Sequence, residues 1–277
     1  MHIQRISAFT SNGAGGNPAG VVLTDQLPAP AVMQRIAAEV GYSETAFAAP
    51  MPDGGWRVRY FAPDMEVPFC GHATVALGAA LGAAHGAGRY ALLINDGAIA
   101  VTAEPSAAGW SCTLQSRPTR STPVDSAMLA DALALFGHTA ADLDPQIAPR
   151  LAHAGSLHLV IALRSRAALS RLSYELAAGK RFMLAHGLVT VMFIHCTDDQ
   201  RFDVRNAFAS GGVLEDPATG AAAAALAGML RDIGWPHGSR ISIRQGEDMD
   251  SPSELEVLLT DEAGAPVQVR GDTRAIG

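Results

Sequence analysis

Three polar residues stand beside apolar runs, and their types are those that move protons. Glu44 lies in Gly-Tyr-Ser-Glu-Thr-Ala-Phe, a turn that enters an apolar stretch, while His72 and Asp216 each lie where a run of small residues begins. A carboxyl group against apolar walls holds its proton at a higher pH than one in water, which suits a proton shuttle. These residue types can do acid–base chemistry, although a Glu at such a turn is, by its local pattern alone, usually a solvated edge residue.

The two runs that follow His72 and Asp216 predict buried helices. Residues 73–84 and 218–230 are rich in Ala, Gly and Leu and have no polar face. A helix that is apolar all round must be enclosed by protein. Pro217 is a helix-start signal and Asp216 can serve as N-cap, so we expect the second helix to begin there.

The starts of two such helices would together form an anion site. The first four N–H groups of a helix lack partners, and the helix dipole adds about half a positive charge there. If the two starts meet at a cleft, they can bind a substrate carboxylate or a developing enolate-like charge. This arrangement needs neither lysine nor metal.

The two runs also resemble each other, which predicts an internal duplication. Aligning Ala73-Thr74 with Ala218-Thr219 gives an offset of 218 − 73 = 145, close to half of the 277 residues. We therefore expect an α+β fold of two pseudo-symmetric halves, each a curved sheet or barrel wrapped around a central Ala-rich helix. The halves are predicted to be residues 1–117, with Glu44 and His72, and residues 118–277, with Asp216. The polar, proline-containing segment 116–123 is the expected linker, and the terminal strand is free to pack back on the first half.

Composition narrows the class of protein. The chain carries 20 basic and 27 acidic residues, for a net charge of −7, and has no basic stripe, so we expect neither a nucleic acid nor a membrane as partner. The three cysteines are widely spaced, which fits a reducing compartment, and the first residues do not form a signal peptide. We therefore expect a cytoplasmic protein.

The sequence indicates no metal and no cofactor. The loop at Gly13–Pro18 is glycine-rich, but no long helix follows it, so it is not a dinucleotide loop. His153 and His158 have no carboxylate at a metal-ligand spacing. Exposed strand edges make a homodimer the default expectation for its assembly.

Three stretches, in this order, resemble the signature stretches of the phenazine-biosynthesis PhzF-like family: GYSETAF, VPFCGHATVA and EDPATGAAAAAL. The early segment GGNPAGVVL is similar too, and the resemblance runs the full length of the chain. It implies two halves like those of diaminopimelate epimerase. It also implies a cofactor-independent isomerase, since the namesake enzyme isomerises a dihydro-hydroxyanthranilate without a cofactor.

The resemblance implies roles for individual residues. Glu44 matches the catalytic acid/base, and His72 and Asp216 match the polar pair that orients the substrate and relays the proton. The remaining matched positions are expected to line the substrate site: the backbone amides around Gly71, Ala73, Gly220 and Ala221 as carboxylate donors, with Asn17 and Ser43 beside them.

This chain departs from the family pattern in two places. Ala221 stands where the family usually has Ser, which removes a hydroxyl worth about 1–3 kcal/mol if its partner is left unpaired. Asp250-Ser251 replaces a Gly-Arg pair further on. Both changes bear on the choice of substrate rather than on the fold.

Two other functions fit the same residues. The first is a racemase or epimerase of a small amino or hydroxy acid, in which Cys70 acts with Glu215 or Asp216 from the other half. The second is a small-molecule-binding relative that has lost turnover, which Ala221 would suit. In the leading interpretation Cys70 is a packing residue and the substrate is a small carboxylate.

Overall fold

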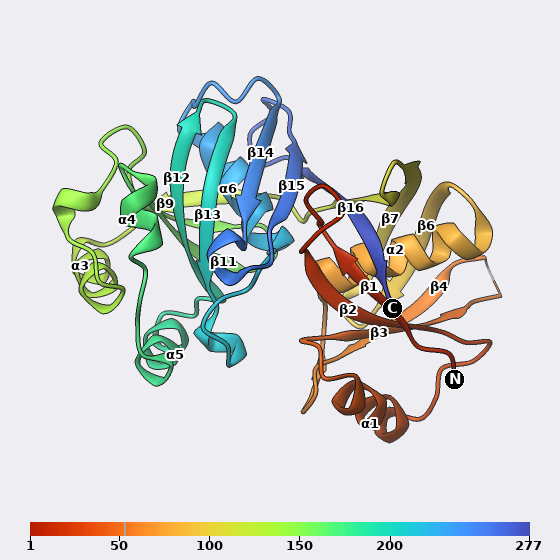
Figure 1. The fold of residues 1–277 in the computed structure, drawn as a ribbon. Coiled ribbons are helices and arrows are strands. Elements are labelled where there is room, and N and C mark those ends of the chain that lie inside the picture. Colours follow the sequence, from red (N-terminus) through yellow and green to blue (C-terminus); the bar gives the residue numbers. More distant parts are fainter. Residues whose placement is uncertain (53) are drawn as a thin grey trace. The chain divides into compact units, whose positions relative to one another are not determined.

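The computed structural model describes residues 1–52 and 54–277, which form two compact units. The first unit contains Met1–Gln115 together with Arg270–Gly277, and the second contains Ser116–Val269. Strand β16 (Gln268–Ile276) begins in the second unit and ends in the first. Figure 1 shows that each unit has its own group of strands and its own enclosed helix, and β16 joins the two groups because it lies between β8 (Gly109–Gln115) and β15 (Ser253–Leu258) in the strand order.

The first unit is a closed barrel. Its strands follow the order β1-β2-β3-β4-β6-β7-β8-β16, and β16 closes the ring because it lies next to β8 and pairs antiparallel with β1. The strands of this unit are β1 (Gln4–Ala8), β2 (Asn17–Leu23), β3 (Thr45–Pro50), β4 (Trp56–Phe61), β6 (Gly88–Ile94), β7 (Gly97–Ser106) and β8 (Gly109–Gln115), with the short β5 (Glu66–Val67) beside β4.

Helix α2 (Gly71–His85) lies inside this barrel, against β1, β2, β7 and β8. All its residues from His72 to Gly82 are buried. Two of its glycines permit the closure: a Cβ at Gly78 would lie 2.7 Å from Val101 Cγ2, and one at Gly82 would lie 2.7 Å from Trp110 Cε3. The small-residue composition is thus required by how closely the strands approach the helix.

Helix α1 (Pro30–Val40) covers the outside of the barrel. Its Met33, Ile36 and Ala37 pack with Phe47 and Phe61 in a small apolar cluster. The helix begins with proline at its first position and ends at Gly41, whose φ of 71° places it in the left-handed region that closes helices. Gly41 therefore turns the chain towards the segment that carries Glu44.

The second unit contains an open sheet in the order β9-β10-β11-β12-β13-β14-β15. Its strands are β9 (Arg120–Pro123), β10 (Arg150–His153), β11 (Leu157–Ala162), β12 (Thr190–Asp198), β13 (Arg201–Ala207), β14 (Arg240–Gln245) and β15 (Ser253–Leu258). The prediction of a linker over 116–123 is wrong for its last four residues, which form β9. That strand lies at the end of the order, where a terminal proline costs no ladder hydrogen bond.

Three helices of the second unit share one apolar cluster on the sheet. They are α3 (Ser126–Leu135), α4 (Arg166–Ser170) and α5 (Leu176–Ala185), and the cluster includes the fully buried Phe136, Leu159 and Phe193. Short 3-10 turns at Ala140–Asp142, Ala209–Gly211 and Glu247–Met249 complete the unit.

A histidine is buried in this second sheet as a structural group. His158 is fully buried, with Nδ1 2.7 Å from Thr190 Oγ1 and Nε2 2.9 Å from Ser156 Oγ. Burial lowers the pKa of His158 to about 3, so its ring is neutral. Both ring nitrogens have hydroxyl partners, which accounts for this residue without a metal.

Helix α6 (Gly220–Asp232) is the second enclosed helix, and its residues from Ala222 to Arg231 are all buried. It begins two residues later than the predicted Ala218, and its N-cap is Thr219 rather than Asp216. The reason lies outside the segment: the Gln245 side chain donates to the Asp216 carbonyl and accepts from the Thr219 amide, which holds 216–219 extended. None of the described helices is long and apolar enough to cross a membrane.

The strand connections repeat between the units, as the predicted duplication requires. In the first unit β2 and β3 run parallel, β3 and β4 antiparallel, and β4 and β6 parallel with α2 between them. In the second unit β11 and β12, β12 and β13, and β13 and β14 repeat this pattern, with α6 as the connecting helix. The prediction of two similar α+β units with enclosed Ala-rich helices is confirmed.

The packing of α2 predicts that Gly78→Ala destabilises the protein. Alanine is favoured over glycine in a helix by about 1 kcal/mol, but overpacking costs about 1–3 kcal/mol. We therefore expect the free energy of unfolding to fall by roughly 1 kcal/mol. Denaturant unfolding of the variant measures this. Gly88→Ala is the control, because a Cβ at that exposed position meets no atom within 4 Å. Equal stability of Gly78→Ala and the wild type would contradict the tight fit.

Candidate active site

Glu44 is positioned by the edge of two parallel strands. It is the residue just before β3, and its carbonyl oxygen accepts a hydrogen bond of 3.2 Å from the Gly20 amide of β2. Gly20 itself must lack a side chain, because a Cβ there would lie 2.6 Å from Thr45 Oγ1. The backbone of Glu44 is therefore held between β2 and β3.

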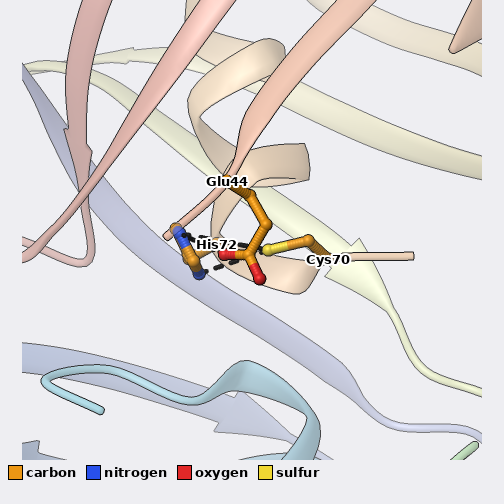
Figure 2. Close-up of side chains that lie close together, drawn as sticks. All are labelled: Glu44, Cys70 and His72. Atoms are coloured by element: carbon orange, nitrogen blue, oxygen red, sulfur yellow. Dashed lines mark hydrogen bonds and ion pairs between the residues drawn. The ribbon is translucent and has the colours of Figure 1, made fainter. Parts of the chain in front are cut away.

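The Glu44 carboxylate lies against His72 at the start of α2 (Figure 2). Its Oε2 is 3.4 Å from His72 Nε2, and the two side chains are 14% and 7% exposed. Oε2 is buried and has no hydrogen-bond partner among the described residues. Because an unpaired buried acceptor costs about 1–3 kcal/mol, this oxygen gains from any proton or donor that reaches it.

Ser43 and Cys70 are the other polar partners of the His72 ring. Ser43 Oγ lies 3.3 Å from Nε2, on the same nitrogen as Glu44, whereas Cys70 Sγ lies 3.3 Å from Nδ1 and 3.9 Å from Nε2. Cys70 was interpreted from the sequence as a packing residue, but its thiol contacts the His72 imidazole. Donor atoms of Glu44, Cys70 and His72 all lie within 4.8 Å of one another.

The start of α2 leaves its first amides without a side-chain cap. Cys70 is the N-cap, and its carbonyl accepts from the Thr74 amide at 3.0 Å and the Thr74 hydroxyl at 2.6 Å. Gly71 borders open space, since a Cβ there would meet no atom within 4 Å, while Ala73 is fully buried. The amides of residues 71–73 are the donors that the sequence predicts for a carboxylate.

A fully buried tyrosine supports this helix start. Tyr60 Oη lies 2.7 Å from Thr74 Oγ1, and burial raises the pKa of Tyr60, so the phenol stays neutral. Asn17, the other predicted binding residue of this unit, is the buried first residue of β2 and lies opposite Ala8 on β1.

In the second unit, Asp216 is held just before α6 by a network of side chains. Its Oδ2 accepts from the Thr219 hydroxyl at 2.5 Å, and its amide donates to the Asn206 carbonyl at 3.1 Å. Thr219 Oγ1 in turn lies 2.6 Å from Asn206 Nδ2 and 3.2 Å from Gln245 Nε2. Asp216 is 9% exposed, so this network fixes a nearly buried carboxyl group.

The predicted binding residues Gly220 and Ala221 form the first turn of α6. As in α2, no side chain caps this helix start, and the first helical donor to the N-cap carbonyl is the Ala223 amide. Gly246 packs beside it with a φ of 78°, and a Cβ there would lie 2.9 Å from the Pro217 carbonyl oxygen. The Gln245-Gly246 pair thus supports the turn that carries Asp216.

Glu215, the alternative acid of the second unit, is already paired. Both its carboxylate oxygens contact Arg205, whose Nε donates to Oε2 at 2.9 Å, and the two side chains are 12% and 11% exposed. Arg205 also donates to the Ser170 carbonyl. A carboxylate held by a bidentate arginine is a poor proton carrier.

Thr219, Asn206, Gln245 and Tyr60 are the supporting residues that sequence reasoning missed. Gln245 was visible in the Gln-Gly motif and Thr219 in EDPATG, but neither motif says which atoms they contact. Asn206 and Tyr60 read as ordinary members of alternating strands. Their partners are set by the fold and not by local spacing.

Known proteins share this chain's fold and most of its length. The family model for phenazine biosynthesis-like proteins (PhzC-PhzF) matches residues 6–276. An uncharacterized isomerase of Deinococcus radiodurans is 34% identical over 96% of this chain and 86% of its own length. A trans-2,3-dihydro-3-hydroxyanthranilate isomerase of Pseudomonas fluorescens is 34% identical over 90% of this chain and 86% of its own length.

Among solved structures, a PhzF-family phenazine biosynthesis protein of Bacillus anthracis has the same fold, with a TM-score of 0.88 at 20% identity over 99% of this chain and 96% of that one. The relatives from Deinococcus radiodurans and Pseudomonas fluorescens are both named isomerases, and this chain is an enzyme of the isomerase class. It belongs to the phenazine biosynthesis-like (PhzF) protein family, as its sequence motifs predicted.

The network around Asp216 predicts different effects for two substitutions of Thr219. Thr219→Val removes the hydroxyl that joins Asp216, Asn206 and Gln245, and leaving such groups unpaired costs about 1–3 kcal/mol. Thr219→Ser keeps the hydroxyl and should stay within about 1 kcal/mol of the wild type. Urea unfolding of both variants measures the difference. If valine and serine are tolerated equally, the hydroxyl does not hold the network together.

Proposed function

We propose that this enzyme is a cofactor-independent isomerase that moves a proton on a small carboxylate-bearing substrate, with Glu44 as general acid/base. The observation that supports it most is the buried, unpartnered Oε2 of Glu44, 3.4 Å from His72 Nε2. A proton shuttle needs an acceptor whose lone pair is not already used by the protein.

The proton would be taken from and returned to carbon by the same carboxyl group. Glu44 as carboxylate removes a proton from a carbon that is alpha to, or allylic to, the substrate's acid system. As the carboxylic acid it returns a proton at a second carbon, either the same proton or one exchanged with solvent, so no net proton or electron is required. His72 faces the carboxylate and Ser43 faces His72, which together hold the carboxyl group in one orientation.

The uncapped amides at the start of α2 would bind the substrate's carboxylate. Backbone donors at a helix start suit an anion because they cost no reorganisation when charge develops. We assign the amides around Gly220 and Ala221 the same role, and Asp216 a share in steering the proton. The support for Asp216 is its match to the family motif and the network that fixes its carboxyl group.

The relative in Pseudomonas fluorescens is named for trans-2,3-dihydro-3-hydroxyanthranilate. Ala221 removes the hydroxyl that family members usually place at this helix start, so we propose a different small carboxylate as the preferred substrate. A racemase using Cys70 would need an acid from the second unit, and the Arg205 pairing of Glu215 leaves Asp216 as the candidate for that acid. Greater loss of activity in Cys70→Ser than in Glu44→Gln would favour the racemase.

Glu44→Gln should abolish turnover while the protein still binds substrate. Glutamine keeps the shape but cannot take a proton, and general acid–base catalysis contributes about 10²–10⁴-fold, so we expect a loss in that range. Affinity should change by less than about tenfold. The assay follows solvent deuterium entering one compound of a pool of small carboxylic acids, by proton NMR in deuterium oxide.

The matched control for this assay is Glu104→Gln, because Glu104 is a carboxylate of the same unit whose side chain is 57% exposed. It should keep wild-type labelling. Near-native labelling by Glu44→Gln would remove Glu44 from the role of acid/base.

Ala221→Ser should raise activity on trans-2,3-dihydro-3-hydroxyanthranilate, which we expect the wild type to convert poorly. The new hydroxyl would lie at a helix start and hydrogen-bond an oxygen as its charge develops, so the gain should appear in kcat more than in KM. Steady-state kinetics of both proteins on this compound decide it. Efficient wild-type turnover that the serine leaves unchanged would show that Ala221 does not set substrate choice.

A further inference from the structure

The group formed by Glu44, Cys70 and His72 has the donor types of a zinc site. A thiol, an imidazole and a carboxylate lie within 4.8 Å of one another at the start of α2 (Figure 2). Thiolate and imidazole donors select zinc over magnesium or calcium, which prefer sets made of oxygen alone. Three protein ligands with one open position are typical of zinc sites that exchange their fourth ligand.

The spacing of the donors fits a tetrahedral ion after one side-chain movement. With zinc bonds of about 2.0–2.1 Å to N and O and 2.3 Å to S, neighbouring donors lie about 3.3–3.5 Å apart. Glu44 Oε2 is already 3.4 Å from His72 Nε2. Cys70 Sγ faces Nδ1 at 3.3 Å and lies 3.9 Å from Nε2, so a change of its rotamer is needed to bring the thiolate to the Nε2 side.

The surroundings favour a cation at this position. Oε2 of Glu44 is buried and has no hydrogen-bond donor, and among the described residues the ring close to it is that of His72, with Nε2 at 3.4 Å. The start of α2 beside this group is open, because a Cβ at the neighbouring Gly71 would meet no atom within 4 Å. A divalent ion would pair the orphaned oxygen and leave one position for water or for a carboxylate.

We propose that Glu44, His72 and Cys70 form a reversible zinc-binding site, and that zinc bound there inhibits the enzyme. Zinc would occupy the lone pair that Glu44 needs to accept a proton, so binding and turnover exclude each other. The inhibition rests on the proposed role of Glu44 as acid/base. Zinc binding itself does not depend on that role, and it is measured without any substrate.

The binding test titrates the full chain, first stripped of metal, with Zn²⁺ by calorimetry and with Co²⁺ by absorption spectroscopy. We expect one equivalent bound with a dissociation constant of about 10 µM or tighter, and a cobalt–thiolate charge-transfer band. Cys70→Ser should lose that band. Cys70→Ser, His72→Gln and Glu44→Gln should each weaken zinc binding by at least about tenfold, since even outer partners of a metal ligand are worth that much.

Cys196→Ser is the matched control, because Cys196 is partly exposed and near the carboxylates of Asp144, Asp198 and Asp199 but outside this group. It should keep the band and the affinity. Thermal melts of the variants without metal check that each is folded. A band that survives Cys70→Ser, or no stoichiometric binding by the wild type, would overturn the proposal.

Activity separates this proposal from the proposed function. Zinc at about ten times its dissociation constant should suppress deuterium labelling about tenfold, and EDTA should restore it. EDTA alone should leave metal-free enzyme fully active. Zinc that binds Cys70 but does not inhibit contradicts the inhibition, whereas labelling that survives Glu44→Gln contradicts the assignment of Glu44.

Discussion

The close contact between each enclosed helix and its surroundings is the constraint on which the site depends. Strands approach α2 so closely that Gly78 and Gly82 have no room for a Cβ. A helix buried to that degree must also bury much of its N-terminal end, where three or four amides have no partner in the helix. Since neither α2 nor α6 has a side-chain cap, donors remain at both starts for a ligand. The packing that stabilises the fold therefore also leaves free the backbone donors to which the proposed function assigns the substrate carboxylate.

Local pattern was enough to predict both enclosed helices, the outer helix over 30–40 and the division into similar units. These features depend on the positions of apolar and small residues, and the local sequence of each segment gives those positions. The start of α6 could not be predicted in this way. Asp216 and Pro217 carry every local signal of a helix start, yet Gln245 from β14 binds the backbone of 216–219 and delays the helix to Gly220. A hydrogen bond across 29 residues overrides an N-cap preference of about 1 kcal/mol.

The internal repeat shows where the two units differ. Strands β3 and β12 begin at Thr45 and Thr190, an offset of 190 − 45 = 145, which is the offset that the sequence predicted for the two Ala-rich helices. The helices α2 and α6 begin at Gly71 and Gly220, an offset of 220 − 71 = 149. The extra four residues lie in the segment before α6, which contains Asp216. His72 in the first unit consequently lies on helix α2, whereas Asp216 in the second unit lies on the loop before helix α6.

The contacts of His72 also imply how its protons are arranged. A neutral imidazole has one N–H and one acceptor nitrogen. Nε2 faces the acceptor Oε2 of Glu44, whereas Nδ1 faces the Cys70 thiol, which is a weak donor. With a proton on Nε2 the ring turns an N–H to the Glu44 carboxylate across 3.4 Å and leaves Nδ1 to accept from the thiol. In the proposed mechanism a protonated Glu44 can become the donor. Nε2 must then accept, so the ring takes the tautomer with its proton on Nδ1, and the contact with Cys70 is reversed. In this proposal a proton gained at Glu44 is linked, through the tautomer of one ring, to the direction of the hydrogen bond between His72 and the Cys70 thiol, so Cys70 influences the proposed acid/base without touching the substrate.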